Sequence, residues 1–241
     1  MKQILFALLI MTLLASCSKQ VDTGTTTTPT DTTTKNTTPP NVMFYNVMDY
    51  GNVGVYLNKV SVASGGIAKY YPTGYNTGVV GTNQIMVVFS SDTVINENVD
   101  LLAGNNYSCF VYRVGYNWKI SIVKDDLTAP TTGNSEVRVL DFRTQAWFSY
   151  IGVNFFSPGN SPLIFNNRNF LDHESYSSYQ SFNTLTAGTY TMTLFTTTAN
   201  LATQTATLSS GKIYTFVLMA NASLTAAQAL LNIQIEQSSN N

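Results

Sequence analysis

The sequence predicts an all-β protein composed of two tandem antiparallel β-sandwiches, and three observations support this fold class. Apolar and threonine side chains alternate through residues 189–194, and a period of two places the apolar side chains on one face of a half-buried strand. Much of residues 188–218 resembles residues 81–111, at an offset of 107 positions. Short strand-like runs are separated by Gly, Pro and Asn turns, and no long amphipathic helix stands between them.

The internal repeat is visible residue by residue. Gly81 matches Gly188, Leu101 matches Leu208, Gly104 matches Gly211, and residues 107–111 match 214–218. The opening strands, at 42–47 and 137–142, match at an offset of 95, so the second copy has gained about 12 residues before its central strands. We place that gain within 155–179, the longest candidate loop. Each copy, at roughly 100 residues, is large enough to bury a core of its own.

Alternating β-branched and aromatic residues bounded by turn residues predict the strands in order. In the first copy these are 42–47, 53–58, 84–89, 107–112 and 118–123, with a loop-rich stretch at 64–78. In the second copy they are 137–142, 188–195, 214–218 and 231–236. Gly211 supplies the positive φ of a tight turn before residues 214–218. Residues 223–231 predict a helical turn or two.

The first residues are typical of a secretory leader. Lys2 is followed by an apolar run at 4–14 that is too short to span a bilayer. The segment Leu14-Ala15-Ser16-Cys17 resembles the lipobox of bacterial lipoproteins, which implies cleavage before Cys17 and its acylation. The alternative is an ordinary signal peptide. By resemblance to the Gram-negative sorting rule, Ser18 favours delivery to the outer membrane, and the sequence leaves open which face the protein occupies.

A threonine-rich segment follows Cys17 and continues to Pro40. It contains several prolines and almost no aliphatic residues, so it cannot bury enough apolar surface to offset the entropy of ordering. We expect a disordered tether that connects a lipid anchor to the first sandwich.

Composition excludes several classes of function. Charged residues make up 10% of the chain, against roughly 25% in typical soluble domains, and the net charge is -1. Because Lys and Arg are dispersed, no basic surface for nucleic acid is expected. Cys17 and Cys109 are the two cysteines, so the mature domains have no pair to oxidise, and we expect Cys109 to be a small buried hydrophobe.

Residues suited to catalysis or metal binding are few. His173, the one histidine, lies in Asp172-His173-Glu174 within the long loop, where we expect a solvated position. The alternative is a hydrolase or metal-dependent enzyme that uses this loop, but no Gly-x-Ser-x-Gly motif accompanies it. A second alternative is Ca²⁺ bound by Asp125 and Asp126 with Asp100 or Asp49. We expect no catalytic residue, no metal and no cofactor.

Aromatic residues in or beside the long loops are the better candidates for ligand binding, because loops on a rigid scaffold commonly carry recognition and tyrosine combines an apolar face with a polar tip. The candidates are Tyr70, Tyr71 and Tyr75 in the first copy, and Phe170, Tyr176 and Tyr179 in the second. The alternative is that these rings cover the open end of each sandwich core.

The opening strands end at Asn46 and Asp141, and three motifs follow in the chain: Val-x-Val-Tyr-x-Asn at 53–58, Ala-Gly-Thr-Tyr-Thr-x-Thr-Leu at 187–194, and Gly-Lys-x-Tyr-Thr-x-Val at 211–217. In these features both copies resemble DUF4397, a domain of unknown function found in bacterial exported and surface lipoproteins, often in tandem. The resemblance covers nearly all of residues 42–236. The Ser-Pro-Asp-Ala-Pro segment that usually follows the first strand of the family is missing from both copies.

Together these features predict a signal peptide at 1–16, an acylated cysteine and tether at 17–40, an Ig-like sandwich at 41–126, a linker at 127–135, a second Ig-like sandwich at 136–237 and a tail at 238–241. The predicted function is that of a non-enzymatic lipoprotein of the cell envelope, anchored in the outer membrane through Cys17 and acting in adhesion, glycan binding or envelope structure. Its expected partners are the membrane and a glycan or envelope protein, and not nucleic acid.

Overall fold

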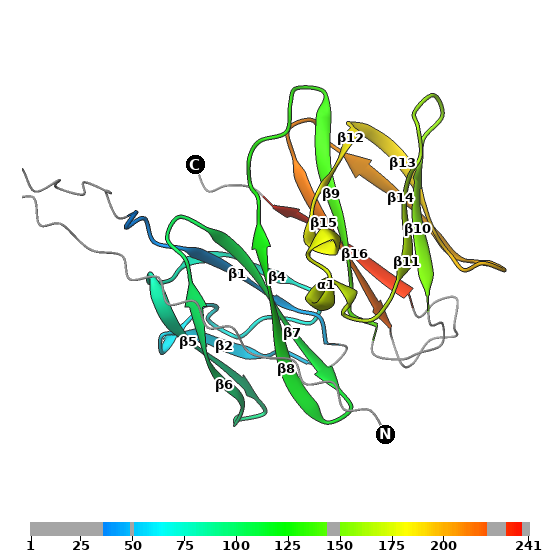
Figure 1. Ribbon diagram of the computed structural model, residues 1–241. Coiled ribbons are helices and arrows are strands. Elements are labelled where there is room, and N and C mark those ends of the chain that lie inside the picture. Colours follow the sequence, from blue (N-terminus) through cyan, green and yellow to red (C-terminus); the bar gives the residue numbers. More distant parts are fainter. Residues whose placement is uncertain (1–35, 49–50, 144–149, 221–229, 238–241) are drawn as a thin grey trace, which may run out of the picture. The chain divides into compact units, whose positions relative to one another are not determined.

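The structure is a computed structural model that describes residues 36–48, 51–143, 150–220 and 230–237. Residues Asn36–Asn241 belong to one compact unit. Within the described residues the chain is mostly strand, and its helical elements are the four-residue helix α1 (Asp172–Ser175) and the 3-10 helix η1 (Ser177–Gln180) (Figure 1). The all-β sandwich prediction is confirmed.

The first sandwich is formed by residues of the first copy. One sheet has the order β4-β1-β7-β8 and the other has the order β3-β2-β5-β6. The strands are β1 (Asn41–Asn46), β2 (Gly54–Leu57), β3 (Val60–Ser61), β4 (Pro72–Thr77), β5 (Gly81–Phe89), β6 (Asp92–Leu101), β7 (Asn106–Val114) and β8 (Asn117–Asp125).

The second sandwich repeats this topology strand for strand, with sheet orders β12-β9-β15-β16 and β11-β10-β13-β14. Its strands are β9 (Asn134–Asp141), β10 (Ile151–Phe156), β11 (Leu163–Arg168), β12 (Asn183–Thr186), β13 (Gly188–Phe195), β14 (Asn200–Leu208), β15 (Ile213–Ala220) and β16 (Leu230–Gln237). The repeat found in the sequence is therefore a repeat of the fold.

Equivalent residues also make equivalent contacts. Gly81 pairs with Leu101 at the end of the β5–β6 ladder, and Gly188 pairs with Leu208 in the same place of the β13–β14 ladder. The turns that follow both contain a glycine with positive φ, 69° at Gly104 and 77° at Gly211. The predicted role of Gly211 in a tight turn is confirmed.

Each copy contains one parallel strand pair that the sequence did not predict. β1 pairs with β7 and β9 pairs with β15 in parallel, whereas the other ladders are antiparallel. Parallel neighbours need a long crossover connection. Here the connection is most of the sandwich itself, because β2 to β6 intervene between β1 and β7. The sheets that contain these pairs are mixed.

Several strands lie where the sequence predicted loops. β4 falls in the stretch 64–78, and β11 falls in the stretch 155–179. Both lie at sheet edges and are rich in Asn, Gly or Pro, so their composition resembles that of a turn. The helical turn predicted at 223–231 lies mostly outside the described residues, and its last two positions begin β16.

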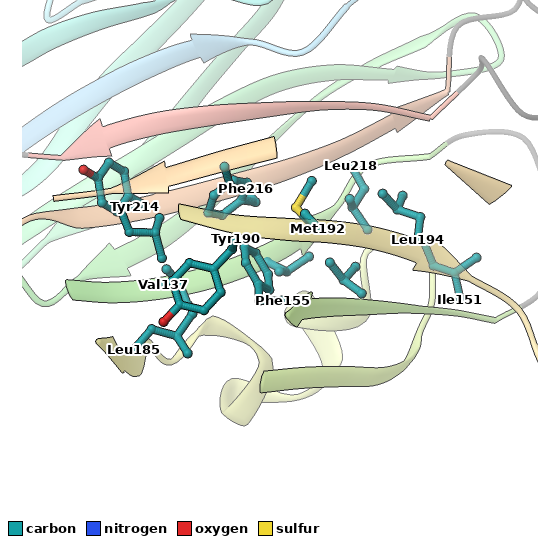
Figure 2. Close-up of a cluster of buried hydrophobic side chains, with 14 residues drawn as sticks. Val137, Ile151, Phe155, Leu185, Tyr190, Met192, Leu194, Tyr214, Phe216 and Leu218 are labelled. Atoms are coloured by element: carbon teal, nitrogen blue, oxygen red, sulfur yellow. The ribbon is translucent and has the colours of Figure 1, made fainter. Parts of the chain in front are cut away.

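Each sandwich encloses a hydrophobic core between its two sheets. In the second sandwich the alternating residues Tyr190, Met192 and Leu194 of β13 pack against Phe155 and Phe216 (Figure 2). The predicted inward face of residues 189–194 is confirmed. In the first sandwich Cys109 is fully buried among apolar side chains, and burial raises the pKa of its thiol. The prediction that Cys109 is a buried hydrophobe is also confirmed.

A third hydrophobic cluster joins residues of both copies. It includes Tyr45 and Phe110 from the first copy, and Leu140, Phe142 and Val217 from the second. The strands β1, β7, β9 and β15 are consequently buried on both faces over most of their length. In β15, Thr215 and Val217 are buried as well as Tyr214, Phe216 and Leu218, which share the other face of the strand.

Candidate binding groove

The two copies differ in the segment before β4 and β12, and the candidate site lies there. In the first copy Tyr70 donates its backbone N–H to the carbonyl of Asn46 (2.7 Å), and in the second copy Leu171 donates its own to the carbonyl of Asp141 (2.9 Å). After these equivalent contacts the first copy enters β4 at Pro72, whereas the second copy forms α1 and η1 before β12. We call residues 172–182 the insertion. It lies partly within the stretch where the sequence placed the gain.

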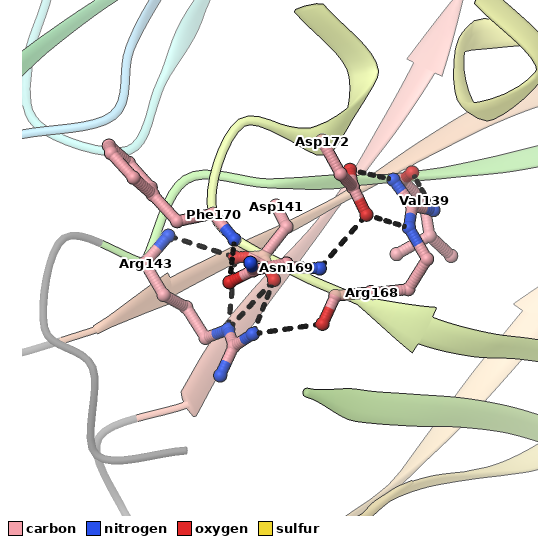
Figure 3. A network of polar contacts seen from close by, with 7 residues as sticks. All are labelled: Val139, Asp141, Arg143, Arg168, Asn169, Phe170 and Asp172. Atoms are coloured by element: carbon pink, nitrogen blue, oxygen red, sulfur yellow. Dashed lines mark hydrogen bonds and ion pairs between the residues drawn. The ribbon is translucent and has the colours of Figure 1, made fainter. Parts of the chain in front are cut away.

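A buried polar network fixes the start of the insertion on β9 (Figure 3). Arg168 donates from Nε and Nη2 to the two carboxylate oxygens of Asp172, each at 2.7 Å, and from Nη1 to the carbonyl of Val139 (2.5 Å). Asn169 donates its backbone N–H to Asp172 as well (2.9 Å). Both charged side chains are almost fully buried, so the pair holds β11, α1 and β9 together.

His173 is not solvated, and the expectation of a solvated loop position is wrong. The side chain is fully buried, with Nε2 3.1 Å from the hydroxyl of Ser121 and its ring 4.9 Å from that of Phe142. Next to it, Tyr112 donates its hydroxyl to Glu174 (3.3 Å). Burial lowers the pKa of His173 to about 4, so the imidazole is neutral at pH 7. The insertion thus contacts β7 and β8 of the first sandwich.

The contact between Ser121 and His173 has the spacing of a nucleophile and its base. Both side chains are buried, however, and the Nδ1 of His173 has no hydrogen-bond partner among the described residues. A triad needs a carboxylate at that nitrogen and an exposed nucleophile. Among the described residues there is also no group of three or more His, Cys, Asp or Glu that could hold a metal ion.

Asp125 is engaged in a buried network rather than available to Ca²⁺. It forms an ion pair with Arg138 at 2.5 Å, and its other oxygen accepts hydrogen bonds from Tyr75 (2.7 Å) and Ser108 (2.8 Å). Asp100 accepts a hydrogen bond from Thr82 on the exposed face of β5 and β6. Asp49, the remaining ligand of this alternative, lies outside the described residues.

The six aromatic candidates occupy different environments. Tyr70, Tyr75 and Phe170 are partly buried against the third cluster, so they pack where the two sandwiches meet and not over the open end of one core. Tyr71 and Tyr176 are exposed, at 66% and 61%. Tyr176 and Tyr179 lie together, with ring centroids 5.6 Å apart, and the guanidinium of Arg168 lies 4.6 Å from the Tyr179 ring. Cys17 lies outside the described residues.

A groove of about 600 Å³ lies between the insertion and the segment that connects the two sandwiches. We call it the linker groove. Its charged lining residues are Lys124, Asp126 and Glu136, and its uncharged polar ones include Thr128, Ser177, Gln180, Ser181 and Thr184. The side chains come from the end of β8, the connection, β9, η1 and β12. Phe182 provides the aromatic ring of the lining.

Several of these side chains are held in place. Hydrogen bonds from Thr128 lower the pKa of Asp126, which is therefore ionised at neutral pH. Thr184 donates its hydroxyl to Glu136 (2.7 Å). The guanidinium of Arg138, which is fully buried, lies 4.4 Å from the centre of the Phe182 ring. The groove therefore presents fixed hydrogen-bonding groups around a braced aromatic ring.

Sequence reasoning missed Phe182 and the linker groove. It singled out Tyr176 and Tyr179, which lie in the same insertion, because tyrosines in a long loop are a local signal. The groove has no local signal, since Lys124 and Thr184 meet only when the connection folds against β12. The predicted linker at 127–135 forms one wall of the groove, with Thr128, Ala129, Pro130 and Thr131.

Comparison with known proteins adds little about this site. No protein-family model matches the chain, and no curated protein matches it. The resemblance to DUF4397 therefore stays a prediction. A solved structure, described as alpha-glucan binding by a streptococcal virulence factor, is similar over 75% of this chain and 93% of its own, with 8% sequence identity and a TM-score of 0.26. A similarity this low carries no information about ligands.

Over the described ranges, none of the helices has the length and apolar character needed to cross a membrane.

Proposed function

We propose that the protein is a non-enzymatic, lipid-anchored module of the cell envelope that binds a glycan in the linker groove. The observation that carries this proposal is the combination of a braced aromatic ring, Phe182, with hydrogen-bonding side chains of several kinds in one open groove. A volume of about 600 Å³ lies within the usual range for small-molecule sites, roughly 300 to 1,000 Å³.

The chemistry of the groove fits a sugar. Sugar hydroxyls donate and accept hydrogen bonds, and the groove offers carboxylates at Asp126 and Glu136 as acceptors and the ammonium of Lys124 as a donor. The C–H face of a sugar ring is apolar and packs on an aromatic side chain such as Phe182. The fixed positions of these side chains matter as much as their chemical type, because groups already held by the fold lose little entropy when a ligand binds.

The anchor is proposed from the sequence. Acylation of Cys17 with two or more chains gives durable attachment, since each buried CH₂ contributes about 0.8 kcal/mol and one chain alone is marginal. Replacing Cys17 with serine is expected to move the protein from the membrane fraction to the soluble fraction. Retention of the variant in the membrane fraction would refute the anchor. Protease added to intact cells then reports the face, since only surface-exposed protein is degraded.

The alternative, a hydrolase that uses His173, would need a change that exposes the buried imidazole and Ser121. We therefore propose a binding protein and not an enzyme. If a hydrolytic activity is detected on any substrate and His173→Ala abolishes it while the variant stays folded, this part of the proposal is wrong.

Glycan binding is tested with the full chain on a glycan array, followed by isothermal titration of each hit. Phe182→Leu removes the ring but keeps a large apolar side chain, and Lys124→Ala removes an exposed donor from the lining of the groove. We expect Phe182→Leu to weaken binding about tenfold, which corresponds to about 1.4 kcal/mol. Lys124→Ala is expected to weaken binding less.

Tyr71→Leu is the matched control, because Tyr71 is an exposed aromatic residue of the first copy that does not line the linker groove. Its affinity should equal that of the unmodified chain. Circular dichroism melting of each variant separates loss of binding from loss of folding. An array with no hits, or hits that folded Phe182→Leu and Lys124→Ala variants bind unchanged, would contradict the proposal.

A further inference from the structure

We propose that the linker groove is the middle part of a longer binding track, and that the track binds an extended, neutral glycan chain rather than a single sugar. This inference rests on the proposed function and specifies the class of glycan. It is carried by two neighbouring hollows that share lining residues with the linker groove and by a second aromatic ring that is braced in the same way as Phe182.

The first neighbouring hollow lies on the far side of η1. It has a volume of about 220 Å³ and lies between β11, η1 and the start of β12. We call it the η1 hollow. Ser181 lines both the η1 hollow and the linker groove, so the two are separated by the width of one short segment. Ser181 is exposed, so an extended ligand that passes over it would contact both.

The second neighbouring hollow lies at the other end of the linker groove. It has a volume of about 480 Å³ and reaches the turn between β6 and β7, at Gly104 and Asn105. We call it the β8 hollow. Lys124, Asp126 and Thr128 line both the β8 hollow and the linker groove. The three depressions therefore follow one another, with the linker groove between the other two.

The η1 hollow repeats the main feature of the linker groove. Its aromatic residues are Phe165 and Tyr179. The Tyr179 ring centre lies 4.6 Å from the guanidinium of Arg168, as the Phe182 ring centre lies 4.4 Å from that of Arg138. Both guanidinium groups are buried and ion-paired, so both rings rest on immobile supports. Tyr179 and Phe182 are three residues apart, so their Cα atoms lie at most about 10 Å from each other and one short segment carries both rings.

The accessible charges of the linker groove favour a neutral chain. Lys124 contributes one positive charge, and Asp126 and Glu136 contribute two negative charges. The arginines beside the rings are neutralised by buried carboxylates. A polyanionic chain would meet like charges at two positions, which disfavours binding, whereas an uncharged hydroxyl-rich chain meets none.

The test is titration of the full chain with neutral linear oligosaccharides of increasing length, from disaccharide to hexasaccharide, in the maltose, cellobiose and chitobiose series. In at least one series the affinity is expected to rise with length, by about tenfold or more between the disaccharide and the hexasaccharide. Tyr179→Leu is expected to remove most of that rise and to leave disaccharide binding unchanged. Tyr179→Phe, which keeps the ring, should restore the dependence on length.

Phe182→Leu is expected to weaken binding at every length, and the Tyr71→Leu control should match the unmodified chain throughout. Binding that depends on Phe182 but not on length, or that Tyr179→Leu weakens equally at every length, would overturn the extended track and leave the proposed function intact. Preference for oligogalacturonides over all three neutral series would overturn the neutral-chain assignment. Absence of any glycan binding would remove the proposed function and the track with it.

Discussion

Removing the carboxylate of Asp125 tests whether the ion pair with Arg138 holds the junction of the two sandwiches together. Both side chains have no exposed surface, and the guanidinium donates to Asp125 (2.5 Å), Thr215 (2.8 Å) and the carbonyl of Lys124 (3.2 Å). Asp125→Ala leaves the charge of Arg138 buried without its counter-ion. Breaking a buried pair in this way typically costs about 3–5 kcal/mol, so we expect the free energy of unfolding to fall by that amount.

The pair is best measured with a double-mutant cycle. Asp125→Ala and Arg138→Ala each leave an uncompensated charge, whereas the double variant leaves none. The double variant is therefore expected to lose less stability than the sum of the single variants, with a coupling of about 1–3 kcal/mol. The assay is urea unfolding followed by tryptophan fluorescence and circular dichroism. Asp126→Asn, an exposed neighbour, is the control and should change stability by less than about 0.5 kcal/mol.

Two results would refute this reasoning. Single-variant effects that add without coupling would show that Asp125 and Arg138 do not interact across the junction. An Asp125→Ala variant as stable as the unmodified chain would show that the carboxylate reaches water in solution. Because Arg138 also supports the Phe182 ring, Asp125→Ala is expected to weaken glycan binding in the linker groove as well.

Three further predictions concern packing and titration. A Cβ at Gly152 would lie 2.2 Å from the Phe195 ring, so Gly152→Ala is expected to lower the free energy of urea unfolding by about 1–3 kcal/mol. In a Phe195→Ala variant the same substitution should cost much less. An equal cost with and without the Phe195 ring would contradict the clash. Burial lowers the pKa of His173 to about 4 from its ordinary value of 6.5, so the unfolded chain binds more protons between these values. The free energy of unfolding should therefore fall by about 2–3 kcal/mol as the pH drops from 7 to 4, and it should fall less in His173→Gln. If the unmodified chain and the variant lose stability equally over this pH range, the buried neutral imidazole is refuted. Cys109→Ser buries a hydroxyl among apolar side chains and is expected to lower the free energy of unfolding by about 1–3 kcal/mol. Cys109→Ala should lower it less. A serine variant more stable than the alanine variant would contradict an apolar site.

Local patterns were informative where a strand has one buried face or where both copies share a turn. The alternation at 189–194 predicted β13, and the turn predicted at Gly211 is found there and at its match Gly104. Edge strands such as β4 and β11 were missed, because side chains at a sheet edge need not be apolar. In β1 the run Val42-Met43-Phe44-Tyr45 is apolar without alternation, which is the pattern of a strand buried on both faces. This run is the local sequence feature that indicates the third cluster, which contains Met43 and Tyr45.

The candidate site was predicted only in part. The sequence identified a long insertion in the second copy and its tyrosines, of which Tyr179 lines the η1 hollow. It placed His173 in solvent because polar residues in a loop are usually exposed. The structure buries His173 against Ser121, some fifty residues earlier in the chain, and such a contact has no counterpart in local periodicity.

The sequence by itself determined the β-sandwich class, the duplication and the burial of Cys109, because each depends on composition or on a period that neighbouring residues define. Only the tertiary structure decided which side chains meet between the copies. Asp125 and Arg138 pair, and Phe182 rests on that pair, because β8, β9 and the insertion converge in space. Whether a strand is buried on its second face, and which residues line a groove, depends on how whole sheets pack against each other. The residues that decide this packing are spread over the entire chain.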